Sequence, residues 1–256
     1  MTIFESIVLG IVEGITEFLP ISSTAHMILA SKMMGLEQNA IHTTFEVAIQ
    51  LGAVLSVLFL YKDKLFQSLS IWIKIAIAFI PMGMLGFLFH SQIKSLFADS
   101  NLIYWMFIVG GVIFILVEWR YKESECTMNT LEKIDYKTAL KIGLFQAFAL
   151  IPGVSRAGAS IIGAMLVGVN RKEATEFSFL LAIPTMFAAT GLDVVKNHNS
   201  MQLDDWSVLA VGFVTAFAVA YLTIKLFLDF ISKFSFVSFG VYRIILGLLF
   251  LFVIQI

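Results

Sequence analysis

The hydrophobic and polar positions of this chain predict six membrane-spanning helices. A spanning helix needs about 20 mostly apolar residues. Six segments have this length and few charges, and they are residues 43–61, 71–89, 102–120, 174–192, 207–227 and 236–255. We expect each of them to cross a bilayer.

Two further apolar regions, 3–35 and 138–169, have a different pattern. A proline and a cluster of small or hydroxyl-bearing residues lie near the middle of each, around Pro20 and Pro152. The halves on either side are too short to cross a bilayer. Short helices broken at proline and glycine predict two re-entrant helical hairpins.

The two halves of the chain resemble each other. Each predicted hairpin is followed by three predicted spans, and an odd number of spans turns the second half over relative to the first. We therefore predict an all-α polytopic membrane protein with an inverted repeat. A single membrane domain, 1–256, would hold repeat one (1–121), a charged cytoplasmic loop (122–137) and repeat two (138–256).

The composition excludes several classes of protein. Apolar residue types make up 59% of the 256 residues and charged types 14%, and mean hydropathy is +0.92. Such a chain is neither disordered nor an ordinary soluble enzyme, and its net charge of −1 gives no field for binding nucleic acid. Cys126 is the one cysteine, which excludes a disulfide framework or a thiolate metal cage.

Lysine and arginine positions predict the orientation. If the hairpins do not cross, the loops on one side hold twelve of these residues and those on the other side hold three. The richer side should be cytoplasmic. Both termini and the first hairpin are then expected on the outer side, and the second hairpin enters from the cytoplasm.

Ionisable residues gather in the first hairpin, where charge is costly. Glu13 and Glu17 are four residues apart, so they share a helix face. Two such carboxylates predict a divalent cation, Mg²⁺ or Ca²⁺, although bonding to the backbone at a helix break is an alternative. Ser22 and Ser23 lie one turn from His26, which predicts either an activated hydroxyl or simple helix capping.

The second hairpin predicts a phosphate cradle. Arg156 cannot lose its charge and favours planar oxyanions, and Gly153 lets the backbone approach an anion. Ser155 and Ser160 are the expected hydroxyl contacts. The alternative is a structural ion pair between Arg156 and a carboxylate such as that of Glu17. In the last span we expect Arg243 to be an intramembrane ion-pair partner.

These motifs resemble the undecaprenyl-pyrophosphate phosphatases, the bacitracin-resistance proteins of bacteria. The likeness spans residues 3 to about 250, and its motifs are EGITEFLPISSTAH (13–26), FEVAIQLG (45–52), PGVSRAGAS (152–160) and FSFLLAIP (177–184). Two positions depart from the family pattern, Ala157 in place of serine and Ser160 in place of threonine. The missing hydroxyl at Ala157 therefore cannot be essential if this chain is active.

The resemblance implies hydrolysis of undecaprenyl pyrophosphate to the monophosphate and inorganic phosphate in the bacterial inner membrane. This recycles the lipid carrier of cell-wall precursors and removes the target of bacitracin. A divalent-cation requirement and a site open to the outer, periplasmic face are also implied. The oligomeric state stays open, a homodimer included.

Joined with the spacing, the resemblance gives a mechanistic hypothesis. Arg156 holds the phosphates, Glu13 and Glu17 hold the cation, and Ser23 is the nucleophile with His26 as its base. Ser22 would position the phosphate or a water, and His26 activating water directly is the other route. A transporter or flippase for polyprenyl phosphate lipids is the competing function, because inverted repeats and broken helices also mark secondary transporters.

Overall fold

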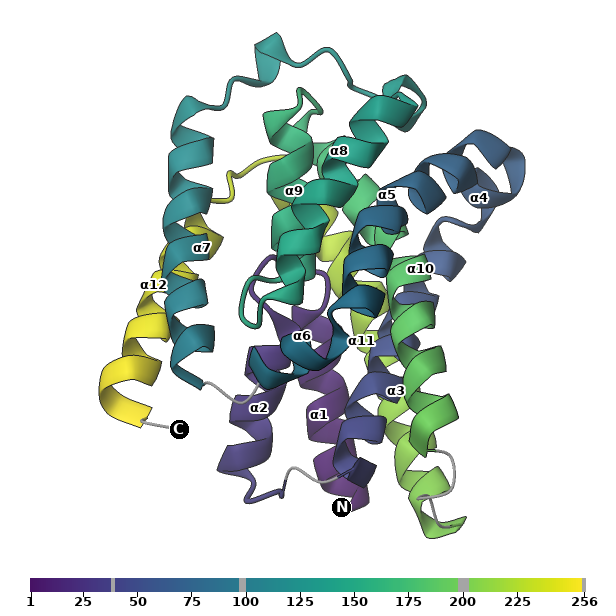
Figure 1. Ribbon diagram of the computed structural model, residues 1–256, viewed down its shortest axis with the longest axis vertical. Helices are drawn as coiled ribbons and strands as arrows, with labels where there is room; N and C mark the ends of the chain where they lie inside the picture. The colour runs from purple at the N-terminus through teal and green to yellow at the C-terminus, as the bar shows by residue number, and fades with distance from the viewer. Residues whose placement is uncertain (38–39, 97–99, 198–202, 255–256) are drawn as a thin grey trace.

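The computed structural model describes residues 1–37, 40–96, 100–197 and 203–254 (Figure 1). These residues form helices and no β-sheet. The helices are α1 (Ile3–Thr16), α2 (Ser23–Met33), α3 (Ala40–Leu60), α4 (Lys62–Gln67), α5 (Leu69–Leu88), α6 (His90–Leu96), α7 (Ser100–Arg120), α8 (Tyr136–Ala147), α9 (Arg156–Leu166), α10 (Arg171–Asn197), α11 (Leu203–Ile231) and α12 (Val237–Leu249).

The predicted spans all form helices. Four helices are long and apolar enough to cross a membrane, and they contain the predicted spans at 43–61, 71–89, 102–120 and 207–227 almost whole. The span predicted at 174–192 lies within the longer and more polar helix α10. The last predicted span forms α12, which continues as a π-helical turn over Phe250–Ile254. The protein is an all-α, multi-pass membrane protein.

Both predicted hairpins are present as pairs of short helices. The first pair, α1 and α2, has 14 and 11 residues, and the second pair, α8 and α9, has 12 and 11. At 1.5 Å per residue none of them exceeds about 21 Å, which is less than a 30 Å hydrocarbon core. The tips of the two pairs point toward each other and meet in the middle of the molecule (Figure 1).

The helix pairs of the two halves pack in matching ways. Helix α1, the first of one half, packs along α11. Helix α8, the first of the other half, packs along α5 in the same way. Helices α7 and α12, the last of each half, pack against each other. Gly111 and Gly240 bring them into contact, because a Cβ atom on either glycine would lie 2.6 or 2.8 Å from the carbonyl oxygen of the other. This pairing agrees with the predicted inverted repeat, which stays a prediction.

Ionic contacts fasten one end of the bundle. Arg171, at the start of α10, donates two hydrogen bonds to the Glu118 carboxylate of α7, at 3.1 and 3.0 Å. Glu118 also accepts from the backbone N–H of Phe236, which precedes α12. The loop between α7 and α8 is held against α5 by buried Lys74, whose Nζ donates to the carbonyls of Leu131 and Glu132.

Candidate active site

A fully buried arginine on α12 joins the two hairpin tips. The Arg243 guanidinium donates to the Pro20 carbonyl at 3.2 Å and to the Gly153 carbonyl at 3.0 Å. It also donates to the carbonyls of Met106 and Phe107 on α7. The expected ion pair is therefore wrong, since the partners are backbone carbonyls. The carbonyls of Pro20 and Gly153 are left over where the hairpin helices break, so they need a donor inside the protein.

The two tips also meet through a buried ion pair. Arg156 Nη2 donates to Glu17 Oε1 at 2.8 Å, and Arg156 Nη1 donates to the Ser178 carbonyl at 2.9 Å. The other carboxylate oxygen of Glu17 accepts from the Ser23 hydroxyl at 2.6 Å. The Glu17 carboxylate thus connects Arg156 of the second hairpin with Ser23 of the first, and both were predicted as site residues.

A cavity of about 180 Å³ opens beside this ion pair. Its lining comes from both tips and from α3, α5 and α10, and includes Glu17, Ser22, Ser23, Thr24, Gln50, Met82, Gly153, Ser155, Arg156 and Thr185. Gln50, which lies within the 45–52 motif, and Thr185 were not predicted as site residues. Their polarity within apolar helices was the available signal.

Two serines with unusual backbone geometry stand at equivalent places in the tips. Ser22 (φ 68°) precedes α2 and Ser155 (φ 58°) precedes α9, and both lie in the left-handed region that L-residues rarely adopt. The Ser155 hydroxyl accepts from the Gly158 N–H and so caps α9. The Ser22 hydroxyl makes no capping bond, and it is available to a molecule in the cavity.

Gly153 lies where only glycine fits. Its φ is 89°, and an added Cβ atom would come within 2.6 Å of the Ile103 carbonyl oxygen on α7. The backbone of the second tip therefore runs against α7 on one side while it lines the cavity on the other.

His26 does not contact a serine hydroxyl in this structure. Its Nδ1 lies 2.8 Å from the Ser22 carbonyl oxygen and its Nε2 lies 2.7 Å from the Tyr242 hydroxyl. Because a carbonyl only accepts, Nδ1 carries the proton and Nε2 accepts from Tyr242. The expected serine–imidazole pair is replaced by the bond between Ser23 and Glu17, and Tyr242 is a further site residue that sequence reasoning missed.

Glu13 is completely buried one turn before Glu17. Neither carboxylate oxygen finds a hydrogen-bond donor among the described residues. Its charged neighbours are Glu17, Glu46 and Arg156. A buried carboxylate in this state needs a proton or a cation, and Glu17 can serve as its partner only if one of the two carboxyls is protonated.

The Ser160 hydroxyl contacts the backbone of Arg156, one helical turn earlier. It is buried, donates to the Arg156 carbonyl at 3.0 Å and pairs with the Ser178 hydroxyl at 2.6 Å. Ser160 is not among the described residues that line the cavity. Ala157 is also buried, with 1% of its surface exposed, so the position that departs from the family pattern packs in the core.

The fold and site define an intramembrane protein whose two opposed hairpins bring an arginine, a carboxylate and serines together at a small cavity. A family model, described as bacitracin resistance protein BacA, matches residues 6–249. The chain belongs to this family.

Relatives agree over nearly the whole chain. A protein of Wolinella succinogenes named undecaprenyl-diphosphatase is 54% identical over 252 residues, which cover 98% of each chain. One of the same name from Persephonella marina is 57% identical, and undecaprenyl-diphosphatase 2 of Pseudoalteromonas translucida is 55% identical, each again over 98% of both chains.

Proposed function

We propose that this protein is an undecaprenyl-diphosphatase, which hydrolyses undecaprenyl pyrophosphate to undecaprenyl phosphate and inorganic phosphate. The observation that carries the proposal is the cavity that Arg156, Glu17, Ser22 and Ser23 line together. The names of the relatives agree with it. A transporter or flippase is not favoured, because an anion carrier needs no hydroxyl held by a carboxylate.

Arg156 is the group that receives the diphosphate. Its Nε atom is buried and has no partner among the described residues, while Nη2 is held by Glu17. An incoming phosphate can bond to the free Nε–H and compete with Glu17 for the rest of the fork. The neighbouring Ser22 hydroxyl and the backbone around Gly153 complete the cradle.

Ser23 is the proposed nucleophile, and Glu17 replaces His26 as the nearest proton acceptor. As Ser23 Oγ attacks the terminal phosphorus, its proton passes to Glu17 along their 2.6 Å hydrogen bond. The bond to the bridging oxygen breaks and undecaprenyl phosphate leaves. Water then attacks the phosphoserine, the bond between Ser23 Oγ and phosphorus breaks, and Ser23 Oγ takes its proton back from Glu17 as phosphate is released. If His26 instead activates water directly, no phosphoserine forms.

A divalent cation, Mg²⁺ or Ca²⁺, would be held by Glu13 and Glu17. The unpartnered, buried oxygens of Glu13 fit a need for positive charge. Among the described residues no group of three or more His, Cys, Asp or Glu is placed to hold a metal, so the substrate's phosphate oxygens and water would supply the other ligands. When bound, the ion neutralises charge on the diphosphate.

The site is proposed to face the periplasm of the inner membrane. The start of α1 and the end of α12 lie at one end of the molecule, opposite the charged loop between α7 and α8 (Figure 1). The excess of lysine and arginine on that side favours a cytoplasmic position for the loop. A homodimer stays a prediction, which light scattering of the solubilised protein tests.

The deciding experiment is phosphate release by the purified protein. We expect undecaprenyl pyrophosphate to yield one inorganic phosphate with Mg²⁺ or Ca²⁺ and far less with a chelator. Equal release with the chelator would contradict the cation site alone. No release under any condition, with lipid still bound, would contradict the enzyme assignment. A phosphorylated Ser23 trapped by rapid acid quench would support the covalent route, and full turnover by Ser23→Ala would exclude it.

A further inference from the structure

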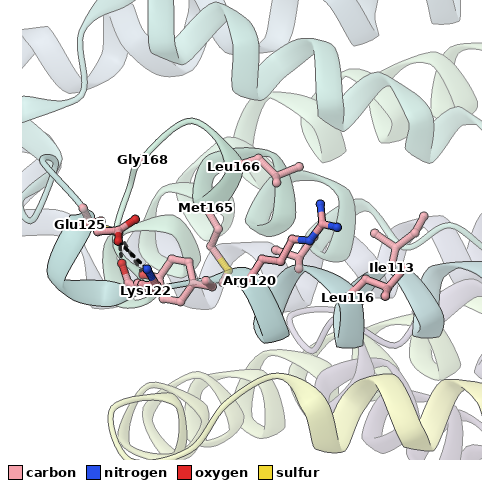
Figure 2. Close-up of a pocket in the computed structure, with 11 residues that line it drawn as sticks. Ile113, Leu116, Arg120, Lys122, Glu125, Met165, Leu166 and Gly168 are labelled. Atoms are coloured by element: carbon pink, nitrogen blue, oxygen red, sulfur yellow. Dashed lines mark hydrogen bonds and ion pairs between the residues drawn. The ribbon is translucent and has the colours of Figure 1, made fainter.

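A second and larger cavity lies at the end of the molecule that carries the charged loop. It has a volume of about 570 Å³ and lies between the end of α7, the loop residues 122–126 and the end of α9 (Figure 2). Its walls are apolar, formed by Ile113 and Leu116 of α7 and by Met165 and Leu166 of α9. Leu116 and Leu166 are each more than half exposed. This cavity is open and is separate from the proposed active site.

The apolar wall continues toward the middle of the molecule. A cavity of about 240 Å³ lies between α7, α8 and α9 and reaches Gly110 and Arg243. It shares Ile113 and Leu166 with the 570 Å³ cavity. Gly110 and Arg120 are ten positions apart on α7, or about 15 Å along its axis. Half of a 30 Å hydrocarbon core has the same depth. The two cavities together form a groove, which we call the α7–α9 groove, as deep as one leaflet.

A cation without an internal partner lies at the mouth of this groove. The exposed Arg120 guanidinium makes no hydrogen bond or ion pair with the residues the structure describes, and it extends back along α7 above Leu116 (Figure 2). Lys122 also lines the mouth but donates to Glu125 at 2.9 Å. Arg171, by contrast, is held by Glu118 and Glu123. The residues that line the mouth therefore include two cations and one carboxylate, a net positive charge.

We propose that the α7–α9 groove binds an anionic membrane lipid from the leaflet on the loop side. The hydrocarbon chain lies along Ile113, Leu116 and Leu166, and the headgroup phosphate binds Arg120. The depth of the groove matches one leaflet of chain, and guanidinium forks favour phosphate. Basic pockets between helices at the cytoplasmic surface are a recurrent means of binding anionic headgroups.

Native mass spectrometry of the full-length protein in detergent tests the proposal. The probes are phosphatidylglycerol, phosphatidylcholine with the same chains, and glycerol 3-phosphate, which has no chain. We expect phosphatidylglycerol to bind more tightly than phosphatidylcholine, and glycerol 3-phosphate not to compete. Arg120→Ala should weaken phosphatidylglycerol about fivefold, which corresponds to one arginine near a charged surface. Its matched control, Lys137→Ala, removes an exposed cation of α8 outside the groove.

A second pair of variants tests the groove itself. Leu166→Trp fills the groove and should weaken both lipids, whereas Leu222→Trp, on an equally exposed position of α11, should not. Equal effects of Arg120→Ala and Lys137→Ala, or of the two tryptophan variants, would overturn the proposal. Competition by glycerol 3-phosphate would replace the lipid with a soluble phosphate. Because binding is the readout, the result does not depend on the diphosphatase assay.

Discussion

The Glu17 carboxylate accepts hydrogen bonds from a charged guanidinium and from a neutral hydroxyl. Arg156 holds one oxygen as an ion-pair partner, while Ser23 donates its proton to the other. The ion pair is the structural lock that the sequence left open as an alternative, and it faces the cavity. A phosphate that takes over Arg156 removes positive charge from Glu17, which makes Glu17 a stronger acceptor for the Ser23 proton. The proposed mechanism thereby couples substrate binding and activation of the nucleophile at a single side chain.

Arg156 should tolerate no replacement. We expect Arg156→Ala to lower kcat/KM by about 10²–10³, the usual loss for one strong electrostatic donor. Arg156→Lys should stay impaired, because an ammonium cannot bond to Ser178, Glu17 and a phosphate in one plane. Steady-state phosphate release measures both variants. Wild-type kinetics for Arg156→Lys would rule out recognition by the planar fork.

Tyr242 should position His26. Tyr242→Phe removes the bond to Nε2 and keeps the ring stacked on the imidazole, whose centroid lies 5.8 Å away. On the route in which His26 activates water, we expect kcat to fall about fivefold, the value of one neutral hydrogen bond, and the pH profile of kcat to shift. Tyr221→Phe is the control, because the Tyr221 hydroxyl bonds Lys225 outside the site. An unchanged profile would mean that the stack alone holds the imidazole.

At the scale of helices, the hairpins were predictable but the contacts between them were not. Pro20 and Pro152 mark the breaks in the sequence, and the short apolar halves on either side set the helix lengths. The spacing of Ser23 and His26 allowed a contact, yet the left-handed backbone at Ser22 aims its carbonyl at the imidazole instead. Tyr242 is 216 residues from His26, so local spacing carries no sign of their contact.

The glycine contact between α7 and α12 should resist enlargement. Gly240→Ala places a methyl group 2.8 Å from the Gly111 carbonyl oxygen, so the helices must separate. We expect a lower melting temperature, with a cost of about 1–3 kcal/mol in the free energy of unfolding. Gly191→Ala, at a helical glycine with nothing within 4 Å, should be neutral or slightly stabilising. Equal melting temperatures for the two variants would show that α7 and α12 can separate without cost.

At the scale of the whole molecule, the orientation in the membrane decides which side of the bilayer each of the two cavities meets. The catalytic cavity lies at the meeting point of the tips, and the α7–α9 groove opens at the end of the charged loop. The loop end carries the positive excess, so the groove should meet anionic lipid of the cytoplasmic leaflet.

Cysteine accessibility should show this orientation directly. In a Cys126→Ser background, Lys133→Cys in the charged loop should react with a membrane-impermeant maleimide only after the cells are opened. Lys32→Cys, near the end of α2, should react in intact cells because α2 enters from the other side. Reversed labelling would show that the protein has the opposite orientation and that the α7–α9 groove opens in the outer leaflet.

The arginines that complete the hairpin tips come late in synthesis. Arg156 follows Glu17 by 139 residues, and Arg243 follows Pro20 by 223. At about 5–20 residues per second, a nascent chain carries Glu17 without its arginine for roughly 7–28 s. During that interval Glu17 and the Pro20 carbonyl lack their arginines, and Glu17 can bond only to the Ser23 hydroxyl of the same hairpin. Full seating of the first hairpin in the membrane should therefore wait until the ribosome has delivered the second half.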